Sequence, residues 1–219
     1  MITLEQVKAS SAIETYIKAA DKSLEALGYT EHSSAHVTKV SSCAGKILEV
    51  LKHDAKTVEL ARIAGYIHDI GNLVNRNDHS TTGAVMAFKL LSDMGAEPED
   101  IATIVTAIGN HDEGTGVPVS DVAAALILAD KTDVRRSRVR NSDFSSFDIH
   151  DRVNYSVVSS RLDLDIQNKT IRLVLLVDTT ISSIMDYFEI FLVRMTMCRK
   201  AAEKLGLAFK LTINEQNFI

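Results

Sequence analysis

The stretch Ile67-His68-Asp69-Ile70-Gly71 carries the strongest signal in this sequence. It closes an apolar helix predicted from about Thr57 to His68, and Gly71 breaks the helical pattern two residues after Asp69. An imidazole and a carboxylate at the end of an apolar helix are costly to bury unless another group compensates them. A divalent cation is the simplest common partner, so the stretch predicts a metal site.

Histidines and aspartates recur beside other apolar segments in the same part of the chain. In chain order these are His32, His36, His79, His111-Asp112 and, after the apolar run Val122–Ala129, Asp130. His32 and His36 are four residues apart and therefore share one face of a helix. Neutral imidazoles with a few carboxylates suit Fe, Mn, Co, Ni or Zn better than Ca, which prefers oxygen ligands alone.

Other chemistry-bearing residues have simpler explanations. His53 is interpreted as a surface or capping residue, and His150-Asp151 as part of a polar connector outside the site. Asp133 is expected either to hold metal or to pair with Lys131 or Arg136.

Helical periodicity dominates the chain from Leu4 to about Ala129. Thr3 and Gln6 form a capping-box pattern that opens a first helix ending at Gly28. Further helices are predicted over residues 33–51, 57–68, 80–94, 98–111 and 122–129. The fold class is therefore mainly α over this part of the chain.

The pattern changes to a small α+β unit toward the carboxyl terminus. Leu162, Leu164 and Ile166 alternate with charged residues, as in a strand with one wet face, and residues 171–177 form a second strand. A long helix over 181–206 and a strand over 209–213 follow. We expect a helical domain over residues 1–145 and a β-β-α-β unit over residues 146–219. Exposed edges in so small a sheet predict a homodimer through this unit.

Composition limits the classes of protein to consider. With 219 residues, 46% hydrophobic and 24% charged, the chain is typical of one large globular domain, or one domain with an appendage, and not of a disordered or fibrous protein. A net charge of −5 gives no global attraction to nucleic acid or anionic lipid. Cys43 and Cys198 cannot form a disulfide framework, and no signal pattern or long apolar run is present, so we expect a cytoplasmic protein without a membrane span.

The His and Asp series resembles the HD superfamily of metal-dependent phosphohydrolases, whose "HDIG" core is intact here at residues 68–71. The resemblance covers about residues 30–140. It implies that one metal is held by His36, His68, Asp69 and Asp130. It also implies that His79 and His111 help to hold a second metal, with Asp69 bridging and with His68 and Asp69 at the catalytic centre. One or two Fe, Mn, Co or Ni ions are expected, with Zn or Mg as alternatives.

Residues 79–83 and 110–118 further resemble the HD-GYP branch of that superfamily. The chain departs from the branch at Asn110, which replaces the first of two adjacent histidines, and at Val117, which replaces a tyrosine. Asn72 stands where a lysine often follows the core, and His32 where part of the branch has a glutamate ligand. After Asp130 the chain resembles a group of uncharacterised bacterial and archaeal HD proteins, which implies an architecture and no substrate.

Five cations lie within ten residues after the predicted ligand Asp130: Lys131, Arg135, Arg136, Arg138 and Arg140. Arginine geometry suits phosphate, although a solvated helix end or a subunit contact would have the same composition. The residues expected to contact substrate are Lys131, Arg135, Arg136, Asn72 and His32.

The leading hypothesis is a metal-dependent phosphohydrolase that uses a metal-activated water on a nucleotide or another small phosphate ester. The alternative is a catalytically weak nucleotide sensor of the same family, in which the α+β unit reports occupancy. A nucleic-acid processing enzyme is disfavoured by the acidic net charge.

Overall fold

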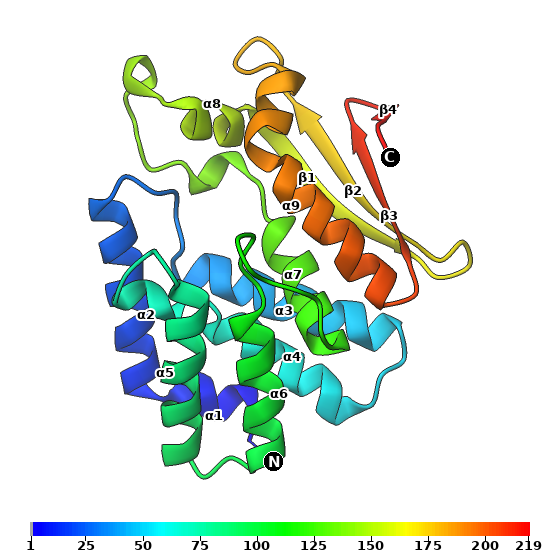
Figure 1. Cartoon of the computed structure of the whole chain (residues 1–219). Helices are drawn as coiled ribbons and strands as arrows, with labels where there is room; N and C mark the ends of the chain where they lie inside the picture. Colours follow the sequence, from blue (N-terminus) through cyan, green and yellow to red (C-terminus); the bar gives the residue numbers. More distant parts are fainter. Residues whose placement is uncertain (1) are drawn as a thin grey trace.

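The chain builds a helical body first and then a small sheet beside it (Figure 1). The computed structural model describes residues 2–219. The helices of the body are α1 (Leu4–Ala9), α2 (Ser11–Ala26), α3 (Ser34–Val50), α4 (Ala55–Ile67), α5 (His79–Asp93), α6 (Pro98–Gly109) and α7 (Asp121–Lys131). The later elements are α8 (Ile149–Ser156), β1 (Val157–Asp165), β2 (Thr170–Val177), α9 (Ile184–Lys204), β3 (Ala208–Ile213) and β4 (Gln216–Asn217). Short 3-10 helices are η1 (Ile70–Leu73), η2 (Arg136–Arg138) and η3 (Phe144–Ser146).

The predicted fold class is confirmed, with three corrections to its elements. The first predicted helix is two helices, because Ser10 ends α1 and its side chain accepts the backbone N–H of Ile13 to begin α2. The expected polar connector contains helix α8, which Asp148 caps by accepting the backbone N–H of Asp151. The short strand β4 extends the β-β-α-β unit by one strand beyond the prediction.

The sheet has the order β1-β2-β3-β4. Strands β1 and β2 form the predicted antiparallel hairpin, with Leu162 opposite Leu173, whereas β2 and β3 are parallel because α9 lies between them in the chain. Helix α9 packs against both β3 and α7. One cluster of buried hydrophobic residues therefore runs through the helical body and the sheet, and the boundary at residue 145 stays a prediction.

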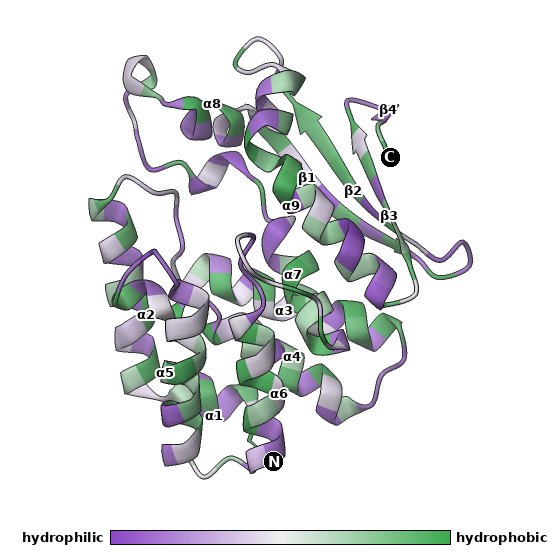
Figure 2. Cartoon of the chain, in the orientation of Figure 1, coloured by the Kyte–Doolittle hydropathy of each residue, from purple (hydrophilic) through white to green (hydrophobic). Residues whose placement is uncertain are grey.

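Helix α7 lies at the centre of the molecule. The apolar run Val122–Ala129 is buried throughout, which confirms the buried helix predicted there, and Figure 2 shows α7 and β2 as strongly hydrophobic segments. Helix α7 packs against α3, α4, α6 and α9. Within residues 2–219 no helix combines the length and apolar character needed to cross a bilayer.

Two glycines allow the close approaches that position the predicted ligands. A Cβ on Gly65 would lie 2.8 Å from Ser41 Cα, so α4 and α3 pack with their backbones almost in contact. A Cβ on Gly71 would lie 2.0 Å from the carbonyl oxygen of His79 and 2.5 Å from the nitrogen of Gly83. The glycine of the His-Asp-Ile-Gly stretch therefore allows the end of α4 to meet the start of α5.

Gly71→Ala is expected to lower the free energy of unfolding by about 3 kcal/mol, because the atoms in its way are backbone and α5 would have to shift. Gly109→Ala is the control: its Cβ would meet only Ala84 Cβ, at 3.7 Å, so stability should stay within about 1 kcal/mol of the parent. Urea unfolding followed by circular dichroism measures both. Equal stability of Gly71→Ala and the parent would contradict the packing argument.

Candidate metal centre

The six residues predicted to hold metal lie together between helix ends. His36 lies in the first turn of α3, His68 and Asp69 follow α4, His79 begins α5, His111 follows α6, and Asp130 lies in the last turn of α7. The four histidines expose 3% of their surface or less, and Asp69 exposes 6%. The apolar helices thus bury a polar cluster that they cannot themselves compensate.

All four histidines present the same ring nitrogen to the centre. Each Nδ1 lies beside an oxygen: Asp133 Oδ2 for His36 (2.8 Å), Gly65 O for His68 (2.9 Å), Arg76 O for His79 (3.1 Å) and Ile108 O for His111 (2.6 Å). Carbonyl and carboxylate oxygens only accept, so each Nδ1 carries a hydrogen and donates it. In the neutral ring the lone pair of Nε2 is then left for the centre.

His36, His68 and Asp130 form a first cluster of candidate ligands. The Nε2 of His36 lies 3.3 Å from Asp130 Oδ1, and the Nε2 of His68 lies 3.2 Å from Asp69 Oδ2. Both Nε2 atoms are buried and make no hydrogen bond within residues 2–219. Buried acceptors that converge without a donor fit a cation, and this mixture of imidazole and carboxylate suits a divalent transition metal.

His79 and His111 form a second cluster with Asp69. Their Nε2 atoms are 3.2 Å apart, and they lie 3.6 Å and 3.8 Å from Asp69 Oδ1. Two lone pairs that face each other at this distance repel unless a positive charge lies between or beside them. Asp69 therefore separates the two clusters, with Oδ2 toward the first and Oδ1 toward the second.

Charges in the centre compensate one another in the absence of a cation. Burial lowers the pKa of His68, but the negative charges of Asp69 and Asp130 outweigh it and raise that pKa to about 10. Burial would raise the pKa of Asp69, yet His68 and its hydrogen bonds hold it well below its usual range. Burial lowers the pKa of His79 to about 4. A proton on His68 thus supplies positive charge to the first cluster, whereas the ring of His79 is neutral at pH 7.

The centre opens into a cavity of about 540 Å³. Of the predicted site residues, it is lined by His32, Asp69, His79, Asp130 and Lys131. Residues that the sequence did not single out complete its wall, among them Tyr29, Arg76, Asn154, Phe191 and Arg194. This volume is typical of a site for a small molecule. A larger hollow of about 990 Å³ between α3 and the β1–β2 hairpin contains none of the predicted ligands.

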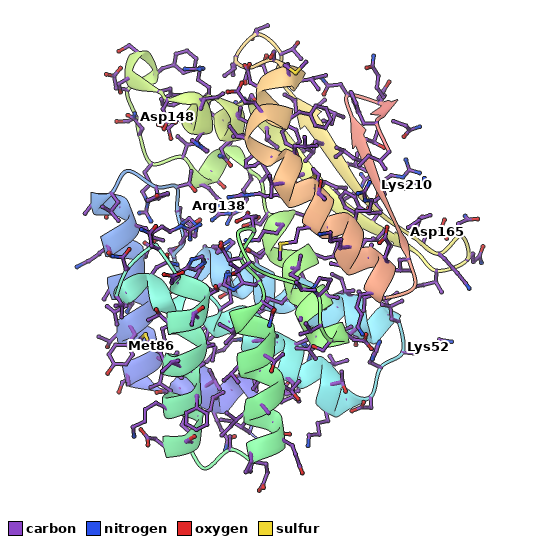
Figure 3. The ribbon with its side chains drawn as sticks, in the orientation of Figure 1. Lys52, Met86, Arg138, Asp148, Asp165 and Lys210 are labelled. Carbon is purple, nitrogen blue, oxygen red and sulfur yellow. The ribbon has the colours of Figure 1, made fainter. Side chains whose placement is uncertain are left out.

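Two of the five clustered cations line this cavity. The Nζ of Lys131 lies 2.8 Å from Asp130 Oδ2, and despite burial the charges of Asp130 and Glu113 raise the pKa of Lys131. Arg138 is buried and donates to backbone carbonyls of Glu31 and Asp133. In Figure 3 it lies between the helical body and α8, where Asp148 is labelled.

Other residues expected to contact substrate lie away from the cavity. Arg135 contacts Asp133 and Glu31, while Arg136 donates to the Tyr155 carbonyl and lies over its ring. Their role in substrate binding stays a prediction that the geometry does not favour. Asn72 is buried, and its Nδ2 donates to the carbonyl oxygen and Oδ1 of Asp69, so it holds that carboxylate in place.

Asp133 lies behind the centre. Its carboxylate accepts from His36 Nδ1 and forms ion pairs with Lys39 and Arg135, at 2.6 Å and 3.0 Å. Neither pairing expected for it, with Lys131 or Arg136, occurs in the structure. The hydrogen bond from His36 and the neighbouring cations outweigh burial and hold the pKa of Asp133 far below its usual range, so it is an ionised acceptor.

The interpretation of His150-Asp151 as lying outside the site is corrected by the structure. Helix α8 folds back so that Asp148, His150 and Asp151 line the cavity. The repeated His-Asp dipeptide was the available signal, but nothing in its local pattern shows where α8 packs. Arg76 and Arg194 gave no signal of their own, because single arginines occur throughout the chain.

Comparisons with known proteins match the part of the chain that contains these residues. Residues 34–135 match the HD domain family, and all six predicted ligands fall within the match. The chain is 28% identical over 163 residues to uncharacterized protein MJ1020 of Methanocaldococcus jannaschii. That similarity covers 64% of this chain and 62% of the relative, so the chain spans less than two thirds of the relative's length. A crystal structure described as a "predicted HD superfamily hydrolase" from an uncultured Thermotogales bacterium is 26% identical, covers 62% of this chain and 75% of its own, and has a TM-score of 0.46.

Metal uptake at pH 7 is expected to release about one proton per chain, because His68 is protonated without metal and a ligand must offer its lone pair. Lower pH favours the protonated ring and therefore weakens binding. Calorimetric titration with Mn²⁺ in two buffers of different ionisation enthalpy measures the release. An identical binding enthalpy in both buffers would contradict it.

Asp133→Asn is expected to weaken metal binding about 10- to 100-fold, because it removes the negative charge that orients and polarises His36 through Nδ1. Competition with a chelator measures the affinity. Asp93→Asn is the control, since Asp93 is exposed at the end of α5 and, within residues 2–219, forms its ion pair with Lys89 alone. Unchanged affinity in Asp133→Asn would show that the carboxylate does not support His36.

Proposed function

We propose that this chain is a metal-dependent phosphohydrolase that acts on a nucleotide or a related small phosphate ester. The observation that carries the proposal is the convergence of four Nε2 atoms and two carboxylates at one end of a cavity lined by cations, where within residues 2–219 the Nε2 atoms of His36 and His68 have no hydrogen-bond partner. The HD domain supports a metal-dependent hydrolase in general. The cationic wall supports a phosphorylated substrate in particular.

We infer two metal positions that share Asp69. His36, His68, Asp130 and Asp69 Oδ2 would hold the first ion, and His79, His111 and Asp69 Oδ1 the second. Fe, Mn, Co and Ni suit this mixture of ligands, and Zn or Mg are alternatives. Bound divalent ions lower the pKa of a water molecule and offset the charge of a phosphoryl group.

The residues of the chain itself position the reactants. Asp69 lies between the two clusters, where its ionised carboxylate can accept a hydrogen bond from an attacking water and orient it. Lys131 remains charged beside Asp130, and Arg138 contributes a second buried cation at the same wall. Both are suited to a phosphoryl oxygen, since the metal end of the cavity is where the reacting phosphate would lie.

A nucleotide sensor is the second candidate, and one set of contacts favours it. Arg194 of α9 lies 2.7 Å from Glu113, which lies 3.4 Å from Lys131, and Lys131 contacts the predicted ligand Asp130. This chain of ion pairs connects the centre to the carboxyl-terminal unit. A sensor would retain metal and bind nucleotide without releasing phosphate, whereas a hydrolase releases phosphate.

The setting of this function is also proposed. Both cysteines are free thiols, which suits a reducing cytoplasm. A second copy of the chain remains the partner expected at the sheet, and nucleic acid is not expected at a cavity of this size.

Protein purified without added metal or chelator should contain about two metals per chain, and His68→Ala should lose them because His68 contacts both carboxylates. Asp69→Ala should retain neither metal nor any phosphatase activity. His53→Ala is the control, since His53 lies outside the cavity and its imidazole lies 3.9 Å from a carboxylate oxygen of Asp121, far from the predicted ligands in the chain's fold. Metal analysis and release of phosphate from a nucleotide panel are the measurements. Full activity of Asp69→Ala would overturn the assignment, and metal retention without turnover in the parent would favour the sensor.

A further inference from the structure

Arg76 reaches the metal centre from the turn between η1 and α5. It lines the cavity that contains Asp69, His79 and Asp130. Its Nη1 lies 3.3 Å from Asn72 Oδ1 and 3.4 Å from His79 Nε2. The guanidinium carbon of Arg76 also lies over the Tyr29 ring, 5.5 Å from the centre of that ring. The half-buried side chain is therefore held at the second cluster of candidate ligands.

Arg76 differs from the other cations of the cavity in having no acidic partner. Lys131 pairs with Asp130 and Glu113, Arg138 with Asp133, and Arg194 with Glu113. Within residues 2–219, no carboxylate oxygen lies within 4.0 Å of the Arg76 guanidinium. Carboxylates offset part of the charge of these three cations, whereas the charge of Arg76 has no such partner among the described residues.

The same residue also orients the imidazole beside it. The backbone carbonyl of Arg76 accepts from His79 Nδ1, at 3.1 Å, while its side chain approaches Nε2 of the same ring. The guanidinium can donate to Nε2 only while that lone pair is free. A cation held by His79 takes the lone pair, and Nη1 is then available to an anion bound next to that cation.

We propose that Arg76 binds the phosphoryl group of the substrate and product beside His79, as a catalytic residue of the centre. This inference rests on the proposed phosphohydrolase function. A guanidinium with free N–H groups matches two oxygens of a phosphate, which a lysine in its place would contact only as a point charge.

The test compares Arg76→Ala and Arg76→Lys with the parent, using inorganic phosphate as the probe for the metal-loaded proteins. Calorimetry should show phosphate bound about 10- to 100-fold more weakly by Arg76→Ala, and to an intermediate extent by Arg76→Lys. Metal content per chain should stay at the parental value, because Arg76 is not a ligand. Added guanidinium ion should restore part of the phosphate affinity of Arg76→Ala. Arg199→Ala, an exposed arginine of α9, is the matched control.

Each outcome of this test has one meaning. Unchanged phosphate affinity in Arg76→Ala would overturn the inference, and so would a loss of metal, since Arg76 would then support the ligands instead of the phosphate. Phosphate binding can be measured whether or not the parent turns over. A parent that binds phosphate through Arg76 but hydrolyses no ester would therefore refute the phosphohydrolase and leave the anion site intact.

Discussion

The rest of the structure depends on one electrostatic constraint. The buried carboxylate of Asp69 is surrounded by the Nε2 atoms of four histidines, and this arrangement of acceptors is stable only when a positive charge is present among them. Every Nδ1 in the group is tied to an oxygen, so every Nε2 faces the carboxylates as an acceptor. Such a cluster is unfavourable in an apolar core unless protons or metal ions enter it. Without metal, the positive charge comes from a proton on His68, whose pKa is raised by the charges of Asp69 and Asp130. The helical body is the scaffold that makes the arrangement rigid.

The ends of the helices allow polar side chains to be buried within an aliphatic core, because backbone groups there are free to form hydrogen bonds with them. Free backbone carbonyls at the ends of α4 and α6 accept from His68 and His111, so the helices orient their own ligands. Gly65 and Gly71 let the backbones approach closely enough for these ends to meet. The carboxyl-terminal unit then closes the cavity, because α8 and α9 add Asp151, Asn154 and Arg194 to its wall.

The sequence predicted the helices, and it also singled out six residues that the structure brings together, because both depend on local sequence patterns. Apolar periodicity marks α3 to α7, and histidines or aspartates at their ends mark the centre. The wall of the cavity could not be predicted in the same way. Nothing in the sequence distinguishes Arg76 and Arg194 from other arginines, and only tertiary packing places both at the wall of the cavity. The opposite holds for Arg135 and Arg136. They are close to other cations in the sequence, but in the structure they contact Asp133 and Tyr155 and do not line the cavity.

The most direct test of this account is anomalous X-ray scattering from crystals of the Mn²⁺-loaded protein. The account predicts two anomalous peaks on opposite sides of Asp69, one among His36, His68 and Asp130 and the other beside His79 and His111. A single peak at the first cluster would restrict the centre to one metal and leave His79 and His111 to substrate. Peaks elsewhere, or none, would contradict the claim that these buried acceptors exist to hold cations.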